Sequence, residues 1–583
     1  MRKKSCFITS AIVFLLLFAT ACKKNSFLGA TVISNIDSND VFNDSAFSME
    51  FLNNIYTKVG FAADPKRFNG GTFAAGLDAA SDEAEGPNAS SSNGFTMFAT
   101  GTVNPSIVPT DAWANCYTMI RAVNQFLAHL YKMPFNATLK SEARGEARFL
   151  RAWYYFIMVE HYGGVPLIGD SVFTTSTPLH MTRSSFRACV DYILSECDSA
   201  YASLPLTQSG ANYGRASGGA CLALKSRVLL YAASPLFNNG GFAKGLSGGL
   251  DSIVAYPDAD PNRWVLAANA ALTLINLNAY QLFVDSIPGK LGYGFMYVFL
   301  QRYNTEYIFA NMMDPSNNKY LEVLWDVPSR GGGGGPHPYQ ELVDAFPMSN
   351  GLDITDPTSG YDPNNPYRNR DPRLNYTIIH DSSIRPIYNQ PPAPVSLYLN
   401  ANSNPPVASS QDAVYTGTPT GFYIAKMLDT NVTQFGFNAS NRCLPLMRYA
   451  EILLNFAEAS NEANGPSLNV YQAVEAVRQR AGLRPYALPV GLDQGGMRTA
   501  IQNERRLEFA FEGQRFFDVR RWLTAAATQN LVMHGMEVDR SSSGTTYKPF
   551  AVRKHNFTNA MYLWPLPLSE IAKSPELQQN PLY

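Results

Sequence analysis

The sequence predicts a mainly α-helical protein in which antiparallel helix pairs support an irregular, loop-rich subdomain with short β-strands. Apolar residues recur at helical spacing in long segments near both ends of the chain. Between Gly289 and Asn441 the composition shifts instead to Gly, Pro, Asn, Ser and Tyr, with only short β-prone runs. Long helices with Ala and aromatic residues at their contact positions are typical of tetratricopeptide-type hairpins, although no strict repeat period is present.

The composition is that of a folded protein with ample core material. The chain has 583 residues, which is more than one hydrophobic core usually fills and favours several layers or subdomains. Hydrophobic residues make up 46% and charged residues 16%, so the chain is expected to be globular and not disordered. The net charge is −1 and no basic run is present, which argues against a nucleic-acid partner.

The N-terminus predicts export and a lipid anchor. Three basic residues at positions 2–4 precede an apolar run from Ile12 to Phe18 and the small residues 19–21. This pattern indicates a signal peptide at residues 1–21, because the apolar run is too short for the alternative, a membrane-spanning helix. A small-residue triplet before Cys22 resembles the bacterial lipoprotein processing site, which implies cleavage before Cys22 and acylation of its thiol. Residues 22–40 are then expected to form a polar tether.

The body divides into three predicted parts. Residues 41–288 form an N-terminal helical part, residues 289–441 a loop-rich ligand-binding subdomain, and residues 442–583 a C-terminal helical part that packs on the scaffold. The expected helices cover residues 47–56, 113–127, 141–162, 185–204, 220–233, 264–276, 446–463, 470–481, 503–522 with a break at Gly513, and 569–572. Two short runs, 320–325 and 376–379, are β-prone.

The stretch from Asn503 to Trp522 has the highest density of charge and aromatic rings. Glu504, Glu508 and Glu512 recur every fourth residue, and five arginines lie near them in the sequence. A glycosidase pair needs carboxylates on opposite sides of a scissile bond, whereas residues four apart on a helix project the same way. The pattern therefore favours structural ion pairing with the neighbouring arginines over catalysis.

Other motifs for chemistry fail on their context. The string G-x-S-x-G at residues 245–249 lacks the flanking strand and helix of a nucleophile elbow. The acidic run that starts at Asp258 lacks the glycine and the final glutamate of a calcium loop, and the histidines and cysteines have no zinc-site spacing. The five cysteines beyond Cys22 are odd in number and scattered, which predicts buried free thiols. No cofactor and no metal site are expected.

Several segments, in order, carry a resemblance to a known family. The chain resembles the SusD/RagB family of outer-membrane nutrient-binding lipoproteins, and the resemblance runs over almost its whole length. The segments that carry it are Cys22 with Phe27-Leu28, Trp113 to Leu127, Gly145 to Leu167, Gly214 to Asn238, Asp371 to Leu374, Arg448 to Glu451, Asn503 to Trp522, and the closing residues from Pro565 to Tyr583.

The resemblance implies a fold, a function and a place in the cell. The fold would be a right-handed superhelix of four tetratricopeptide-like helix pairs behind a more irregular ligand-binding half. The protein would be a non-catalytic binder, lipid-anchored in the outer membrane and facing the cell exterior. It would deliver glycans, or peptides in some branches, to a SusC-like TonB-dependent transporter. A secreted hydrolase and a purely structural transporter lid are the weaker alternatives.

Candidate ligand contacts come from the regions in which the family tends to bind its ligand. Sugars stack their C–H faces on aromatic rings and pair their hydroxyls with Asp, Asn and Arg side chains. The alternative for each of these residues is packing in a subdomain core, because large aromatic side chains are more often buried than exposed. The candidates are Asp78, Asp82, Asn93, Phe95, Phe98, Tyr320, Trp325, Arg330 and Tyr339.

Overall fold

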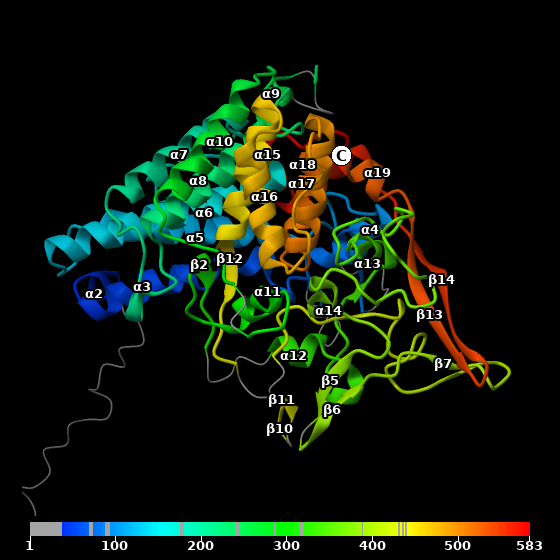
Figure 1. Ribbon diagram of the computed structural model, residues 1–583. Helices are drawn as coiled ribbons and strands as arrows, with labels where there is room; N and C mark the ends of the chain where they lie inside the picture. The colour runs from blue at the N-terminus through cyan, green and yellow to red at the C-terminus, as the bar shows by residue number, and fades with distance from the viewer. Residues whose placement is uncertain are drawn as a thin grey trace, which may run out of the picture.

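The computed structural model of the chain consists of a helical stack joined to an irregular half (Figure 1). The structure describes residues 38–68, 74–87, 94–174, 180–239, 244–245, 248–284, 287–314, 320–387, 389–429, 432–433, 436–437 and 440–583. The predicted signal peptide, Cys22 and nearly all of the predicted tether lie outside these residues.

The helical stack contains the long helices from both ends of the chain. Consecutive helices pack on one another from α5 to α8, then α8 packs on α10, α10 on α15, and α15 on α16 and α17. The stack therefore continues in space across the long irregular segment that separates α10 from α15 in the sequence. Its members are α3 (Ser45–Tyr56), α5 (Asp111–His129), α6 (Ala137–Tyr162), α7 (Phe186–Tyr201), α8 (Gly218–Ala233), α10 (Asn262–Asn276), α15 (Tyr449–Asn464), α16 (Leu468–Arg480), α17 (Gln494–Glu508) and α18 (Gln514–Arg521). The predicted fold class is confirmed.

Side-chain caps explain where several of these helices begin. The Asn136 side chain accepts a hydrogen bond from the backbone N–H of Leu139 at 2.8 Å, and Ser217 caps α8 in the same way through Ala220 at 3.1 Å. The predicted break at Gly513 is also present, because α17 ends at Glu508 and Gly513 has a φ of +74° directly before α18.

The irregular half is built from short elements joined by turns. Its helices are α11 (Tyr293–Tyr297), α12 (Tyr320–Trp325), α13 (Gln340–Ala345) and α14 (Arg373–Thr377), with 3-10 turns at Val298–Leu300 and Pro328–Arg330. Its strands are β3 (His337–Pro338), β4 (Ile378–Ile379), β5 (Ile384–Ile387), β6 (Gln390–Pro394), β7 (Leu399–Asn400), β8 (Val407–Ala408), β9 (Tyr423–Ile424), β10 (Val432–Thr433) and β11 (Gly436–Phe437).

One of the two predicted β-prone runs is a helix, so that prediction is wrong. Residues 320–325 form helix α12, because Leu321, Leu324 and Trp325 share one buried face while Val323 is 48% exposed. Of the second β-prone run, only Ile378 and Ile379 form a strand, β4, which pairs with β9.

Two antiparallel pairings shape the junctions of the irregular half. Strand β2 (Tyr307–Asn311) pairs with β12 (Leu444–Arg448), so the beginning and the end of the irregular segment lie side by side. Strands β13 (Val532–Ser541) and β14 (Gly544–Lys554) form a long hairpin that projects from the molecule, and β13 also pairs in parallel with β7 (Figure 1). The hairpin lies within residues 442–583, for which the sequence predicts a helical part without strands.

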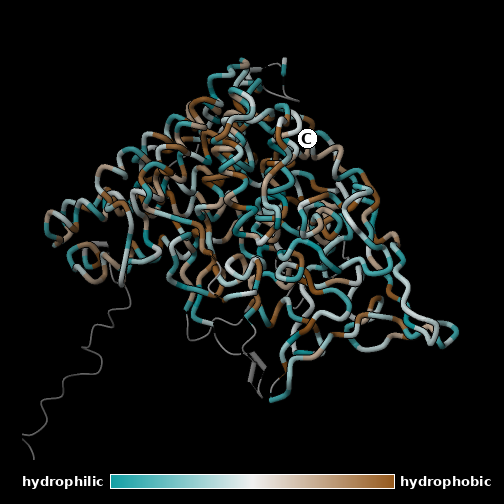
Figure 2. The backbone as a smooth tube through the Cα atoms, viewed as in Figure 1, coloured by the Kyte–Doolittle hydropathy of each residue, from teal (hydrophilic) through white to brown (hydrophobic). Residues whose placement is uncertain are grey.

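Each half has its own hydrophobic core. One cluster runs through the helical stack and includes Trp153, Phe156 and Trp564, whereas a second lies in the irregular half around Trp325 and Phe346. Apolar residues concentrate along the helical stack, while the β13–β14 hairpin and the β5–β6 end are mostly hydrophilic or neutral (Figure 2). All five cysteines beyond Cys22 are buried free thiols, as predicted.

Candidate functional site

The predicted contacts Asp78 and Asp82 lie in a segment that is buried throughout, residues 74–86, which includes strand β1 (Ala84–Glu85). We call it the buried acidic segment. Burial alone would raise the pKa of Asp82, but the guanidinium groups of Arg515, at 2.7 Å, and Arg506, at 3.5 Å, hold this pKa well below its usual range. Asp82 is therefore an ionised partner of the helical stack.

Two other acidic groups of the buried acidic segment, Asp78 and Glu83, have the opposite electrostatic character, whereas Glu85 is paired with Arg553 at 2.7 Å. Burial raises the pKa of Asp78 to about 7, against the attraction of Lys426. Burial, with the charges of Asp78 and Asp82, also raises the pKa of Glu83 well above its usual range. Neither carboxyl oxygen of Glu83 has a hydrogen-bond partner among the described residues. Proton affinity thus differs sharply between carboxyl groups only a few residues apart.

The predicted aromatic contacts are packed inside the protein. The Phe98 ring lies 4.7 Å from the Trp564 ring and 5.3 Å from the Phe516 ring, measured between centroids. The Tyr339 hydroxyl donates to Glu85 at 2.8 Å. Phe95, Phe98, Trp325 and Tyr339 are each at most 1% exposed, so none offers a free ring face to a ligand in this conformation. This burial agrees with the alternative stated above, that these side chains pack in a subdomain core. A ligand-binding role for them stays a prediction.

Of the remaining predicted ligand contacts, Arg330, Tyr320 and Asn93, the structure describes the side chain of Arg330 alone. Arg330 is half-buried at the end of a 3-10 turn, and its Nε has no hydrogen-bond partner among the described residues. Tyr320 begins α12, but its side chain lies outside the description, as do Asn93 and Cys22 entirely. The structure places Asp82 and Tyr339 in one region, since β1 pairs with β3, whereas Trp325 belongs to the core of the irregular half.

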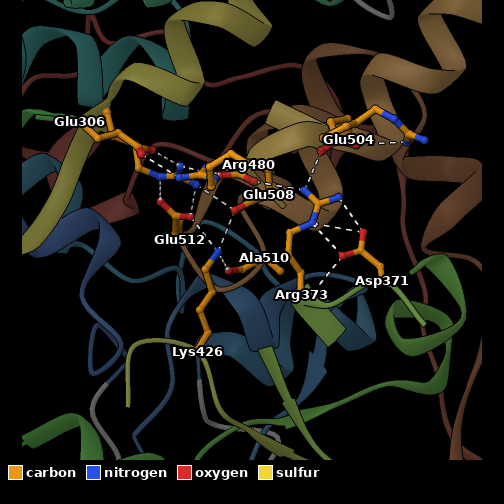
Figure 3. A network of polar contacts seen from close by, with 11 residues as sticks. Glu306, Asp371, Arg373, Lys426, Arg480, Glu504, Glu508, Ala510 and Glu512 are labelled. Atoms are coloured by element: carbon orange, nitrogen blue, oxygen red, sulfur yellow. Dashed lines mark hydrogen bonds and ion pairs between the residues drawn. The ribbon is translucent and has the colours of Figure 1, made fainter. Parts of the chain in front are cut away.

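The glutamates of the predicted ionic helix form a buried network where the two halves meet (Figure 3). Glu504 contacts Arg373 at 2.6 Å, and Glu508 contacts Arg448 at 2.7 Å and also Arg480. Burial would raise the pKa of Glu508, but these cations lower it to about 2. The predicted structural ion pairing of these glutamates is confirmed. The predicted partners are wrong, because the glutamates pair with cations distant in sequence and the neighbouring arginines pair with other carboxylates. Arg505, for example, contacts Asp518 at 2.9 Å.

An open cleft in the irregular half brings rings and polar groups together. It has a volume of about 460 Å³, and we call it the outer cleft. Tyr303 on its wall is 59% exposed, and Tyr297 is half-buried with its ring stacked on Tyr293 at 5.2 Å between centroids. The outer cleft is lined by Tyr297, Leu300, Gln301, Arg302, Tyr303, Asp429, Ser440 and Asn441.

Three polar side chains of the outer cleft are held in place by the backbone or by one another. Arg302 donates to the carbonyl oxygens of Met313 at 2.8 Å and Arg442 at 3.2 Å. Ser440 donates to Asp429 at 2.8 Å. Ordered polar groups beside exposed rings are suited to bind a molecule with both apolar faces and hydroxyl groups. Sequence reasoning missed these residues, although the tyrosine-rich run from 293 to 303 was a usable signal.

Other kinds of site are not found in the part of the chain that the structure describes. Within those residues, no group of three or more His, Cys, Asp and Glu side chains is placed to hold a metal ion. No described helix combines the length and the apolar character needed to cross a membrane.

A helix stack of tetratricopeptide-like type that carries an irregular half with an open, ring-lined cleft defines the structural class of this protein. Residues 298–583 match the family model described as the SusD family, and residues 35–230 match a model described as starch-binding and associating with the outer membrane. The chain belongs to the SusD/RagB family.

Individual relatives extend this assignment. SusD-like protein P25 of Formosa agariphila is 32% identical over 169 residues, and this match spans 28% of the chain and only 29% of that relative's length. A solved SusD-like protein from Bacteroides fragilis NCTC 9343 is 28% identical with a TM-score of 0.75, covering 94% of this chain and 98% of that one. A SusD-like carbohydrate binding protein from the same strain has a TM-score of 0.72 at 23% identity, over 92% and 100% of the two chains.

Proposed function

We propose that this protein is a non-catalytic glycan-binding lipoprotein that passes its ligand to a SusC-like TonB-dependent transporter in the outer membrane. The observation that carries the proposal is the outer cleft. Its volume of about 460 Å³ lies within the usual range of ligand sites, roughly 300–1,000 Å³. A relative of the same fold is described as carbohydrate binding, which supports the same ligand class.

The chemistry of the outer cleft fits a sugar chain. The exposed Tyr303 ring offers a face on which the C–H groups of a sugar can stack. Gln301 and Asn441 present amides that can donate to and accept from hydroxyl groups, and Arg302 presents a guanidinium already oriented by two carbonyl oxygens. The ring therefore supplies contact area, and the polar groups fix the orientation of the sugar.

The residues predicted from the sequence take different places in this proposal. Arg330, Tyr320 and Asn93 stay candidate ligand contacts. The buried members Asp78, Asp82, Phe95, Phe98, Trp325 and Tyr339 are proposed to support the irregular half from within, because their surroundings are protein.

The proposed location rests on the N-terminal pattern and on the family description. Acylation of Cys22 would hold the protein at the outer membrane, facing the cell exterior, with the tether of residues 22–40 between lipid and body. Pulldown of the lipidated full chain from solubilised outer membranes, followed by identification of co-purifying barrel proteins, tests the transporter partnership.

Binding to a polysaccharide panel tests the ligand class. The full chain in detergent solution should be retarded in gels that contain soluble starch, laminarin or xyloglucan, and Tyr303→Ala should lose about tenfold in affinity. Tyr131→Ala removes a 72% exposed ring of the helical stack outside the outer cleft, so it should leave binding unchanged. Binding of a tryptic peptide pool with no glycan bound would replace this proposal by the peptide alternative, and release of reducing ends would overturn the non-catalytic role.

A further inference from the structure

A second cleft lies between the helical stack and the irregular half. It has a volume of about 200 Å³, and we call it the inner cleft. One wall comes from the α7–α8 connection and the other from the chain around β2. The side chains that matter for its chemistry are Thr207, Gln208, Tyr213, Arg215, Tyr280 and Thr305.

The two clefts share one wall. Tyr213 lines the inner cleft and Tyr303 the outer cleft, and the two rings meet edge to face with 4.9 Å between their centroids. The next residue, Asn304, lines the inner cleft, and its backbone N–H donates to the Tyr213 hydroxyl at 3.4 Å. The two clefts therefore adjoin at this pair of rings, of which Tyr303 is the exposed one.

The inner cleft is preformed. Gly214 has a φ of +84°, a conformation that favours glycine, and the Met312 side chain packs directly against it. The Gln208 side chain donates to the Ala216 carbonyl at 2.9 Å and ties the connection to the start of α8. A ligand that enters this cleft would not have to order its walls, which favours affinity.

The charges of the inner cleft favour a neutral ligand. Its guanidinium group, Arg215, already contacts Glu146 at 2.7 Å and donates to Asn53 at 2.6 Å. Around this ion pair the cleft presents hydroxyl, amide and phenol groups. Because the positive charge is compensated, an acidic group gains little here, whereas sugar hydroxyls find donors and acceptors.

We infer that the inner cleft is a second subsite, which binds a neutral sugar unit of the same oligosaccharide that occupies the outer cleft. The oligosaccharide crosses the shared wall over Tyr303, with sugar units bound on both sides of it. The protein thus selects an extended neutral glycan over a single sugar or a charged one. This inference rests on the proposed function and adds to it the length and the charge of the ligand.

A length series measured on blocked variants tests the second subsite. The full chain in detergent solution is titrated with neutral malto- and laminari-oligosaccharides of two to eight residues. The affinity of the protein should rise roughly tenfold or more once an oligosaccharide is long enough to span both clefts. Thr207→Trp places an indole at the exposed rim of the inner cleft and should abolish this gain while leaving the shortest chains unaffected. Ser209→Trp, an exposed position that lines neither cleft, is the matched control.

The possible outcomes separate the two proposals. An unchanged length dependence in both Thr207→Trp and a second blocking variant, Thr305→Trp, would overturn the second subsite while leaving glycan binding intact. Equal affinity for short and long chains in the unaltered protein would do the same, as would tighter binding of oligogalacturonate than of the neutral series. Absence of binding to every oligosaccharide and polysaccharide would overturn the proposed function itself, and this inference with it.

Discussion

The helical stack and the irregular half satisfy their buried backbone in different ways. Within the helices, carbonyl oxygens accept from N–H groups one turn further along the chain. In the irregular half, turns and short strand pairs supply such bonds, and buried cations add further donors. Arg370 donates to the carbonyls of Pro366, Val343 and Phe346 at 2.6–2.8 Å. Where the two halves meet, Lys426 of the irregular half donates to the carbonyls of Glu508 and Ala510, at the end of α17, at 2.8 and 2.7 Å.

This difference shows how a region with little regular secondary structure can still bury a hydrophobic core. A buried carbonyl without a donor costs free energy, and a guanidinium group with five N–H donors can serve several carbonyls at once. The cations that do so are in turn costly to bury, which is why many of them also pair with carboxylates. In the irregular half, side chains with several donors thus supplement the backbone bonds of turns and short strands.

The largest expected effect comes from the network that joins the two halves. Arg448→Met would remove contacts at 2.7–2.8 Å to Glu306, Glu508 and Glu512 and leave these buried carboxylates with too little positive charge. We expect a loss of about 3–5 kcal/mol in the free energy of unfolding, measured by urea denaturation. Arg498→Met, whose side chain is 43% exposed beside Glu462, should cost less than about 1 kcal/mol. Equal losses in the two variants would contradict this reasoning.

A smaller and more local effect is expected within the irregular half. Arg370→Met removes the donor for three carbonyls, and we expect a loss of about 2–3 kcal/mol. Hydrogen exchange should quicken in residues 343–370 and stay unchanged in α6 and α15. Arg368→Met, at an exposed position two residues earlier, serves as the control. Faster exchange throughout the helical stack would show that the two halves are not stabilised separately.

The smallest effect distinguishes the two aspartates of the buried acidic segment. Because the pKa of Asp78 is raised to about 7 in the fold, its contribution to stability is present at low pH and is lost as the pH rises from about 4 through 7. Asp78→Asn should therefore leave the free energy of unfolding nearly unchanged at pH 4 and raise it by about 1–2 kcal/mol at pH 8. Asp82→Asn should lower it at pH 8, since that carboxylate is paired with Arg515. Thermal unfolding of both variants at pH 4 and pH 8 measures these changes in stability. If both substitutions stabilise or both destabilise the protein at pH 8, the proposed difference between the two aspartates is wrong.

The helical stack was largely predictable from the sequence. Apolar periodicity located most of the long helices to within a few residues, because helix signals are local. The caps Asn136 and Ser217 place the starts of α6 and α8 a few residues before the predicted ones. The irregular half was predictable only in composition. Residues 320–325 have an apolar pattern too short to separate helix from strand, and burial of Leu321 and Trp325 on one face decided for the helix.

The candidate site was less predictable, for a physical reason. Rings such as Trp325 and Tyr339 are suitable for a ligand by residue type, but exposure depends on packing by residues distant in sequence. The Tyr339 hydroxyl, for example, donates to Glu85 across the β1–β3 pairing, which no local pattern encodes. Likewise, the outer cleft joins residues 297–303 to Asp429 and Asn441, more than a hundred positions further along.

The pairing of β2 with β12 gives the irregular half the form of a closed stem with a large loop. Since the stem and the packing of α10 on α15 fix both of its ends, an insertion inside this loop does not have to stretch the scaffold. The entropy of closing a flexible loop grows slowly with its length, by roughly 0.6 kcal/mol for each doubling. Segments of this loop can therefore be lengthened or replaced at a small cost in stability, while the helices behind it keep their packing.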